Sequence, residues 1–226
     1  MQIVESSFDA LRSARITLVS ESCAARITLF PMVHVGVPAF FDQVATDALT
    51  HDLVLADGIP GRVARRLTRV YRWAGLVRLG LVVQPKPPEE AHVRNADLSE
   101  AAFARAWATV PFRQRVLFSV GSACVGVALR VTGSRAFLAR HLALDDLRSR
   151  DDVFDAAGPH ASVLTALMHA RDVNLAKHLD AALHDAQNGN IAVVYGAAHM
   201  PSLLRHLRDT HGYRPAYSTW LTVFGY

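Results

Sequence analysis

Apolar runs that stop abruptly at a polar residue recur along the chain, and the clearest of them predicts a buried strand. Residues 191–195, Ile-Ala-Val-Val-Tyr, are followed by Gly196 and, three residues later, by His199. Five apolar or aromatic residues in succession fit a strand that is buried on both faces of a parallel sheet. A helix is predicted next, from Pro201, Leu203, Leu204 and Leu207. His199 is therefore expected in a sharp turn between strand and helix, where it would serve a site or merely satisfy the turn rather than pack in the core.

Two earlier apolar runs end in the same way. Residues 26–33 lead to His34, and residues 52–56 lead to Asp57. In open α/β sheets, ligands collect beyond the carboxyl ends of the strands, where the following helices also point their free N–H groups. His34, Asp57 and His199 are therefore expected to lie around one cleft at this edge of the sheet.

Further strands and a first helix are predicted near the two ends of the chain. The sequence Ala-Arg-Ile-Thr-Leu occurs at residues 14–18 and again at 25–29, which indicates two adjacent strands joined by a short turn. Residues 218–224 are rich in β-forming side chains and predict a final strand. A helical apolar face is predicted from Phe40, Phe41, Val44 and Leu49.

The middle of the chain, about residues 99–189, is predicted to be helical. Ser99 is a suitable N-cap for a helix that runs to about Arg115. Residues 116–129 are apolar, but the run is shorter than the roughly 18 to 20 residues that cross a bilayer. We therefore expect a buried helix there rather than a membrane span.

A long helical pattern opens at Pro159 and continues to Leu183. Arg171 and Asn174 are three residues apart on it, so they share one face and could converge on the cleft. The same spacing fits a pair on the protein surface equally well. Together these elements predict an α/β fold with a parallel-rich mixed central sheet, flanking helices and a helical insertion in the middle.

Composition agrees with an ordinary globular chain. Its 226 residues are 51% hydrophobic with a net charge of +4, so a single domain over residues 1–226 with one core is expected. The first residues lack a basic segment followed by an apolar one, so no secretory signal is expected and a cytoplasmic location is the simplest interpretation. Only Cys23 and Cys124 are present, which excludes a disulfide framework and a thiolate zinc site. Any metal ion would be held by histidine and carboxylate.

One stretch is strongly basic. No acidic residue occurs between Asp57 and Glu89, and five arginines fall at helical spacing within residues 62–72. A basic amphipathic helix can rest on anionic lipid or on nucleic acid. A solvated helix face is favoured, because no nucleic-acid-binding motif is present. We expect no nucleic-acid partner. Weak contact of the 62–72 helix with a membrane surface is kept as an alternative.

Several of these stretches resemble the TraB/GumN/Tiki family. They occur in family order, and the resemblance covers residues 26–226. Gly196 to His199 matches the family's GxxH motif in full, whereas Pro31 stands where glycine is frequent and Asp57 where glutamate is usual. The stretches are Pro-Met-Val-His-Val-Gly at 31–36, Leu-Val-Leu-Ala-Asp-Gly at 53–58, Arg171 with Asp172 and Asn174, Val-Tyr-Gly-Ala-Ala-His at 194–199, and Gly212-Tyr213.

The resemblance implies a fold and an activity. The family is similar, more distantly, to the erythromycin esterase and ChaN proteins, whose parallel-rich sheet is covered by helices and interrupted by an all-helical excursion. Tiki-type members are metal-dependent peptidases, and their ligands map onto His34, Asp57 and His199. The catalytic set implied by the resemblance is Asp57, Arg171 and Asn174.

The leading hypothesis is a metal-dependent hydrolase that acts on a peptide or a small molecule. Two histidines and a carboxylate suit manganese, cobalt, iron or zinc, and such an ion lowers the pKa of bound water and polarises a carbonyl group. Arg171 would steady the oxyanion or a substrate carboxylate. A second hypothesis is a ChaN-like module that binds haem or another small ligand without turnover. A third is a membrane-surface regulator that uses the arginines of residues 62–72.

Overall fold

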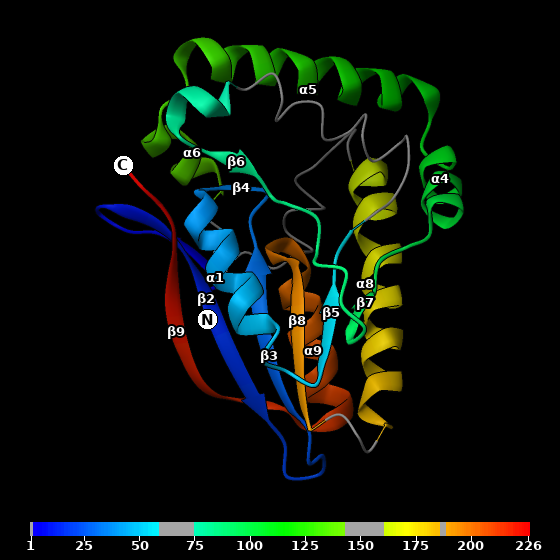
Figure 1. Cartoon of the computed structure of the whole chain (residues 1–226). Coiled ribbons are helices and arrows are strands. Elements are labelled where there is room, and N and C mark those ends of the chain that lie inside the picture. Colours follow the sequence, from blue (N-terminus) through cyan, green and yellow to red (C-terminus); the bar gives the residue numbers. More distant parts are fainter. Residues whose placement is uncertain (1, 59–74, 143–160, 186–188) are drawn as a thin grey trace.

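The computed structural model describes residues 2–58, 75–142, 161–185 and 189–226. Its main sheet is seven-stranded in the described residues, with the order β1-β2-β3-β8-β5-β7 and with β9 paired to the other edge of β2 (Figure 1). The strands are β1 Val4–Ser6, β2 Ala10–Val19, β3 Arg26–Met32, β5 Leu53–Ala56, β7 Val93–Asn95, β8 Asn190–Gly196 and β9 Arg214–Gly225. Two short strands, β4 Val35–Gly36 and β6 Val82–Val83, pair separately.

The sheet is mixed, and its centre is parallel. Strand β8 runs parallel to β3 on one side and to β5 on the other, and β5 runs parallel to β7. The pairings of β2 with β1, β3 and β9 are antiparallel. The expected α/β class with a mixed central sheet is therefore confirmed, as is the expected pairing of the two neighbouring strands that contain residues 14–18 and 25–29.

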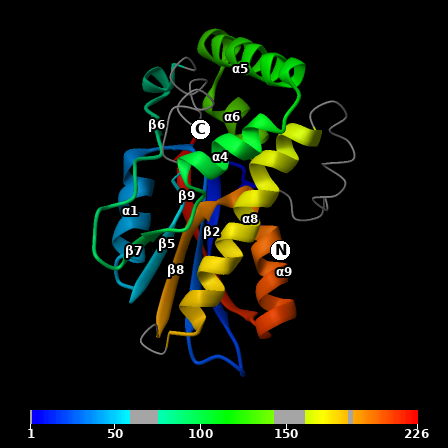
Figure 2. The same ribbon diagram turned by 90° about the vertical axis from the view of Figure 1, so that its right-hand side faces the viewer.

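Helices flank this sheet on both faces (Figure 2). Helix α1, Pro38–Ala48, covers one face, and α9, Met200–His211, covers the other with α8, Ala161–Leu183, packed beside it. Between β7 and β8 every described element is helical, as expected for the middle of the chain. These elements are α4 Glu100–Ala108, α5 Phe112–Thr132, α6 Arg135–Leu142 and α8.

The central strands are apolar because both of their faces are covered. Ile191, Val193 and Tyr195 of β8 have no exposed surface, and neither does Leu29 of β3. Leucines from the flanking helices, among them Leu179 and Leu207, complete the same cluster. A strand that is buried on both faces must satisfy its polar groups through the sheet and end before polar side chains begin. The sharp ends of the apolar runs therefore coincide with the ends of β3, β5 and β8.

The helix predicted from Ser99 to about Arg115 is interrupted. Ser99 is the N-cap, since its hydroxyl accepts a hydrogen bond from the Ala102 N–H at 3.2 Å, and this part of the prediction is confirmed. The helix nevertheless ends at Ala108, and α5 begins after Pro111. Proline cannot donate an N–H within a helix, so it ends one helix and opens the next.

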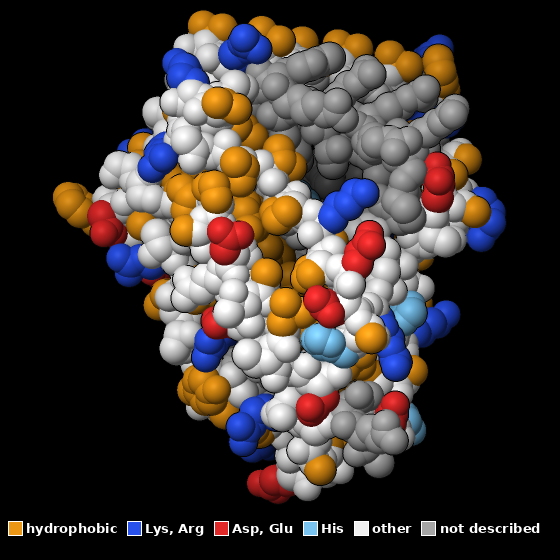
Figure 3. Space-filling model, in the orientation of Figure 1, with side chains coloured by type: hydrophobic (Ala, Val, Ile, Leu, Met, Phe, Trp, Pro, Cys, Tyr) orange, Lys and Arg blue, Asp and Glu red, His pale blue; other side chains and the backbone are white. Residues whose placement is uncertain are grey.

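The prediction of a buried helix over residues 116–129 is wrong. Helix α5 is extended by the turns on either side of the apolar run, and only 6% of its most apolar window is buried. Within the described residues, α5 is the one helix with the length and composition to cross a membrane. Figure 3 shows hydrophobic side chains along the top, where α5 lies. Exposed ones include Phe112, Val116, Leu117, Val120, Val125, Val127 and Val131.

The physical reason is that α5 has no single apolar side for the core to cover. Its apolar residues are spread around the axis, and two of its contacts with the body lie at its C-terminal end. Arg130 packs against Gly75, and Arg78 donates a hydrogen bond to the carbonyl oxygen of Gly133 at 3.0 Å. The arginine helix expected at residues 62–72 lies outside the described residues, as do residues 143–160 with the expected helix start at Pro159.

Candidate functional site

Three parallel strands bring the predicted side chains to one edge of the sheet. His34 follows β3, Asp57 follows β5 and His199 ends the short 3₁₀ turn Ala197–His199 after β8. The Asp57 N–H donates to the carbonyl oxygen of Val194 at 2.9 Å, which holds the end of β5 against β8. Asp57 and His199 are buried, with 6% and 2% of their surface exposed, whereas His34 is exposed.

Gln84 bridges two of these groups. Its side-chain Nε2 donates to Asp57 Oδ1 at 2.9 Å, and its Oε1 lies 3.3 Å from Nδ1 of His34. Its backbone N–H also donates to the carbonyl oxygen of His34 at 2.9 Å. His34 and Asp57 therefore belong to one polar network, but the amide of Gln84 stands between them.

Burial raises the pKa of the Asp57 carboxyl group. The nearby charges of His34 and Arg171 and the hydrogen bond from Gln84 act in the opposite direction and do not cancel the effect of burial. A carboxyl group in this state holds its proton to a higher pH than an exposed aspartate, so it can serve as an acid.

His199 is oriented by a carboxylate from α8. Its Nδ1 lies 2.5 Å from Oδ1 of Asp172, and both side chains are buried. Because the carboxylate accepts, Nδ1 carries the hydrogen and Nε2 is left with its lone pair. Burial lowers the pKa of His199, and the hydrogen bond to Asp172 offsets only part of that shift. The imidazole is therefore neutral at neutral pH and presents Nε2 as a base or as a ligand.

Gly196 keeps a space open between the two buried groups. A Cβ atom at this position would lie 3.4 Å from Cδ2 of His199 and 3.8 Å from Oδ2 of Asp57. Any larger side chain would occupy the gap that these two atoms border. The glycine of the GxxH stretch thus leaves room for a small reacting group between an acid and a base.

Arg171 and Asn174 both reach the loop that follows β7. The guanidinium group of Arg171 donates through Nε at 3.0 Å and Nη2 at 2.6 Å to the two carboxylate oxygens of Asp97, whose side chain is fully buried. Asn174 donates to the carbonyl oxygen of Ala96 at 2.8 Å. Neither side chain points to bulk solvent, and together they fasten α8 to the edge of the sheet.

The charge of Arg171 is largely committed to Asp97. Burial lowers the pKa of Arg171, but Tyr195 and Asp97 raise it by more, so the group stays ionised. Its guanidinium carbon lies 5.2 Å from the ring centroid of Tyr195. The Tyr195 hydroxyl is buried without a hydrogen-bond partner among the described residues, and burial raises its pKa. Arg171 thus supports the site by fixing Asp97 and Tyr195.

The donors that the resemblance assigns to a metal ion do not converge in this arrangement. In the described parts of the chain, the one trio of His, Cys, Asp or Glu ligand atoms within 4.8 Å of one another lies elsewhere, at Asp180, His206 and His211. His199 and Asp57 have suitable chemistry, but His34 is engaged by Gln84. As these side chains lie, His34, Asp57 and His199 do not fit a three-donor metal centre.

Sequence reasoning did not assign a role to Gln84, Asp97 or Asp172. Asp97 follows a strand end, as Asp57 does. Strand β7 has only three residues and is partly exposed, however, so no apolar run precedes Asp97 in the sequence. Asp172 adjoins Arg171 in the stretch that resembles the family, and this was the only available signal. Gln84 lies in an irregular segment, and only the fold shows that it reaches Asp57.

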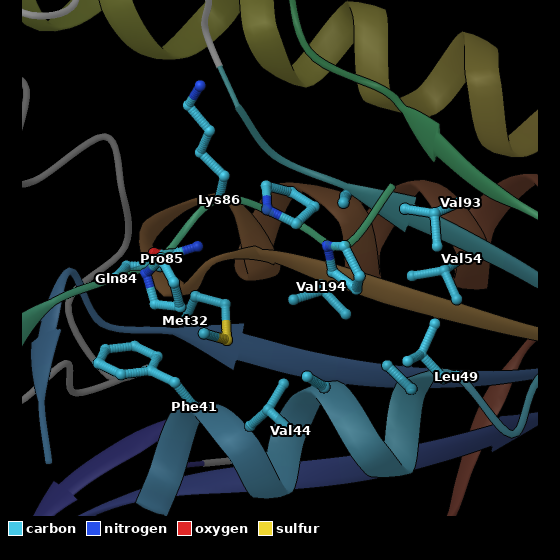
Figure 4. A pocket seen from close by; sticks show the side chains of 15 residues that line it. Met32, Phe41, Val44, Leu49, Val54, Gln84, Pro85, Lys86, Val93 and Val194 are labelled. Carbon is cyan, nitrogen blue, oxygen red and sulfur yellow. The ribbon is translucent and has the colours of Figure 1, made fainter. Parts of the chain in front are cut away.

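An apolar pocket adjoins the site (Figure 4). It lies between α1 and residues 84–88 and encloses a cavity of about 50 Å³. Met32, Phe41 and Val194 contribute to its lining, and Gln84, the residue that contacts Asp57, lines it as well. A small apolar group could therefore be held within reach of the polar network.

No protein-family model matches the sequence, and neither a curated protein nor a solved structure matches the chain.

Proposed function

We propose that the chain is a hydrolase that works in the space between Asp57 and His199. The observation that carries this proposal is the pair of opposed buried groups beside Gly196, one with its pKa raised and the other with its pKa lowered. Two titratable groups whose environments push their pKa values apart are the arrangement used for general acid and general base catalysis.

Each residue has a defined task in this proposal. Nε2 of His199 accepts a proton from a water molecule, and the oxygen of that water attacks a carbonyl carbon. Asp172 holds the imidazole in the required tautomer and stabilises the imidazolium ion that forms. Protonated Asp57 donates its proton to the leaving group, and the proton on His199 returns the site to its starting state by way of solvent and Asp57. Arg171 is a positioning residue that acts through Asp97.

The apolar pocket supports a substrate class. A pocket of about 50 Å³ beside Gln84 suits a small apolar side chain next to the bond that is cleaved. Peptides and small esters or amides that carry such a group are the proposed substrates.

The experiment is a hydrolysis assay of the full chain with chromogenic esters and short peptides. His199→Gln and Asp57→Asn should each reduce turnover by about 100-fold or more, because general acid and base catalysis typically contributes that much. His184→Gln, which changes an exposed histidine just after the end of α8, should retain turnover. Equal turnover in all four proteins would refute the proposal.

The metal ion that the resemblance implies is tested on the same samples. Elemental analysis should find manganese, cobalt, iron or zinc in the wild-type chain, with occupancy reduced in both His34→Ala and His199→Gln, if these residues bind it. An absence of hydrolysis accompanied by a Soret band in the purified chain would support the haem-binding module instead.

A further inference from the structure

A second group of aspartate and histidine side chains joins α8 to α9. Asp180 lies on α8, two turns after Asp172, and His206 and His211 lie on α9. Nε2 of His206 and Nε2 of His211 are each 2.8 Å from the same oxygen, Oδ1 of Asp180. This group is separate from the network of Asp57 and His199, and the proposed hydrolysis does not use it.

The three donor atoms are arranged as ligands for a single ion. All of them lie within 4.8 Å of one another, and the two imidazole rings stand at 76° with centroids 5.7 Å apart. Ligands of a tetrahedral ion at about 2.1 Å from the metal are roughly 3.4 Å from each other. Small rotations of the three side chains would therefore replace two hydrogen bonds to one oxygen by three bonds to one ion.

The backbone that carries His211 is held in place. Hydroxyl groups of Ser20 and Ser22 donate to the His211 carbonyl oxygen at 2.7 and 3.0 Å. Gly212 follows in the left-handed conformation with φ of 68° and ends α9 there. These contacts fix the last turn of the helix, so little ordering of the backbone is needed when a ligand binds.

Partial exposure leaves a route for the ion and room for water. The Asp180, His206 and His211 side chains are 35%, 28% and 14% exposed. Three protein ligands with an open position accept a water molecule as the next ligand. Two imidazoles and one carboxylate favour zinc, cobalt, nickel or copper over magnesium and calcium, which prefer oxygen ligands.

We propose that Asp180, His206 and His211 form a site for a divalent ion of the zinc type that fastens the end of α8 to the end of α9. The ion is bound by Oδ1 of Asp180 and by Nε2 of both histidines, and binding displaces the protons that Nε2 carries in the hydrogen-bonded form. The proposed role of the ion is to hold the two helix ends together, and this role does not depend on whether hydrolysis occurs.

The test is a titration of the chelator-treated full chain with Zn²⁺ by calorimetry and with Co²⁺ by absorption spectroscopy. It is carried out in the His199→Gln background, so that the proposed hydrolase site does not contribute. Asp180→Ala, His206→Ala and His211→Ala should each weaken Zn²⁺ binding by at least about tenfold, since each removes one of three ligands. His178→Ala, a change of an exposed histidine on α8, should leave the affinity unchanged.

The outcomes are distinguishable. The site is supported if the three ligand variants lose Zn²⁺ affinity while their circular dichroism spectra stay unchanged. In addition, Zn²⁺ should raise the melting temperature of the parent only. Equal Zn²⁺ affinity in the parent and in the three variants, or no binding by the parent at concentrations up to about 1 mM, overturns it. If one alanine variant does not fold, His206→Gln, which keeps a hydrogen-bonding side chain but removes the imidazole, gives the same comparison.

Discussion

Two groups of aspartate and histidine side chains lie along α8 and at or near α9, and they differ mainly in their access to water. The Asp172–His199 contact is buried beneath the edge of the sheet, and the Asp180 group is partly exposed near the other end of the helices. Burial forces the first contact into one tautomer and one geometry, because an unpaired polar group there would be costly. Because the Asp180 group is partly exposed, it can exchange its hydrogen bonds for contacts with water or with an ion at little cost in free energy. The same residue types are therefore suited to catalysis in one place and to reversible binding in the other.

The largest expected effect is that of His199→Ala. Hydrolysis should be lost, and the free energy of unfolding should fall by about 3 to 5 kcal/mol, because removing one side of a buried contact between a carboxylate and an imidazole is costly. This differs from the sequence-based expectation that His199 would contribute little to the core. Chemical denaturation and the hydrolysis assay measure the two effects separately.

Leu203→Ala, on the helix that follows His199, is the matched control. Leu203 is 3% exposed, so a cavity should cost about 2 to 5 kcal/mol while turnover per folded molecule is retained. A His199→Ala/Asp172→Ala double variant should be more stable than the sum of the single changes predicts, since the second change removes a contact that the first has already broken. Additive effects would show that the two side chains do not act as a pair.

Asp57→Asn should lower turnover by about 100-fold and yet raise the melting temperature at neutral pH. The pKa of Asp57 is raised by burial, so the folded state holds this proton more tightly than the unfolded chain does. Its favourable contribution is present below the unfolded pKa of about 3.9 and is lost as pH rises through the folded pKa. Asparagine stays neutral, so its advantage should shrink as the pH is lowered. A lower melting temperature of the variant at every pH would contradict this account.

The pH dependence of stability should reveal the buried histidine. The pKa of His199 is lowered by burial, so below the unfolded value of about 6.5 the unfolded chain takes up a proton that the folded chain does not. Stability from this group is thus present above about pH 6.5 and is lost as pH falls toward the folded pKa. The melting temperature of His199→Gln should fall less steeply with decreasing pH over this range than that of the wild type. If the melting temperatures of the two proteins fall equally with pH, His199 keeps an ordinary pKa.

The smallest effect is expected for Asp180→Ala without metal. Its partners are partly exposed, so the free energy of unfolding should change by less than about 1 kcal/mol. Denaturation in the presence of a chelator measures this value. A loss as large as that of His199→Ala would remove the contrast between the two contacts.

The parts of the fold that the sequence predicted are those with strong apolar periodicity. The strand before Gly196 and the ends of the runs at His34 and Asp57 were visible because buried strands are continuously apolar. Strand β7 could not be predicted in this way, because only three of its residues pair and two of them are exposed. The sequence places α5 in the core because its run of apolar residues is too short to cross a bilayer, and neither the length nor the composition of a run reports whether a neighbouring surface exists to cover it.

The candidate site, like the fold, could be predicted only where the sequence shows a periodic pattern. Positions at strand ends could be predicted because the topology of parallel sheets brings such ends together. The contacts of Gln84 with Asp57 and of Asp97 with Arg171 depend on loops whose paths no periodic pattern encodes. The meeting of Asp180 with His206 and His211 depends on the way in which two helices pack, which spacing along either helix alone does not determine.

The pairing of β2 with β9 has a consequence for the order in which the chain folds. The Tyr226 hydroxyl donates to the carbonyl oxygen of Ser7 across 219 residues of sequence, and β9 runs along the whole of β2. Contacts between such distant segments form late, because the entropy of closing the intervening loop must be overcome first. Until β9 arrives, one edge of β2 exposes unpaired backbone groups, which can pair with a strand from another molecule. Dilute refolding should therefore give a higher yield of the monomeric fold than concentrated refolding.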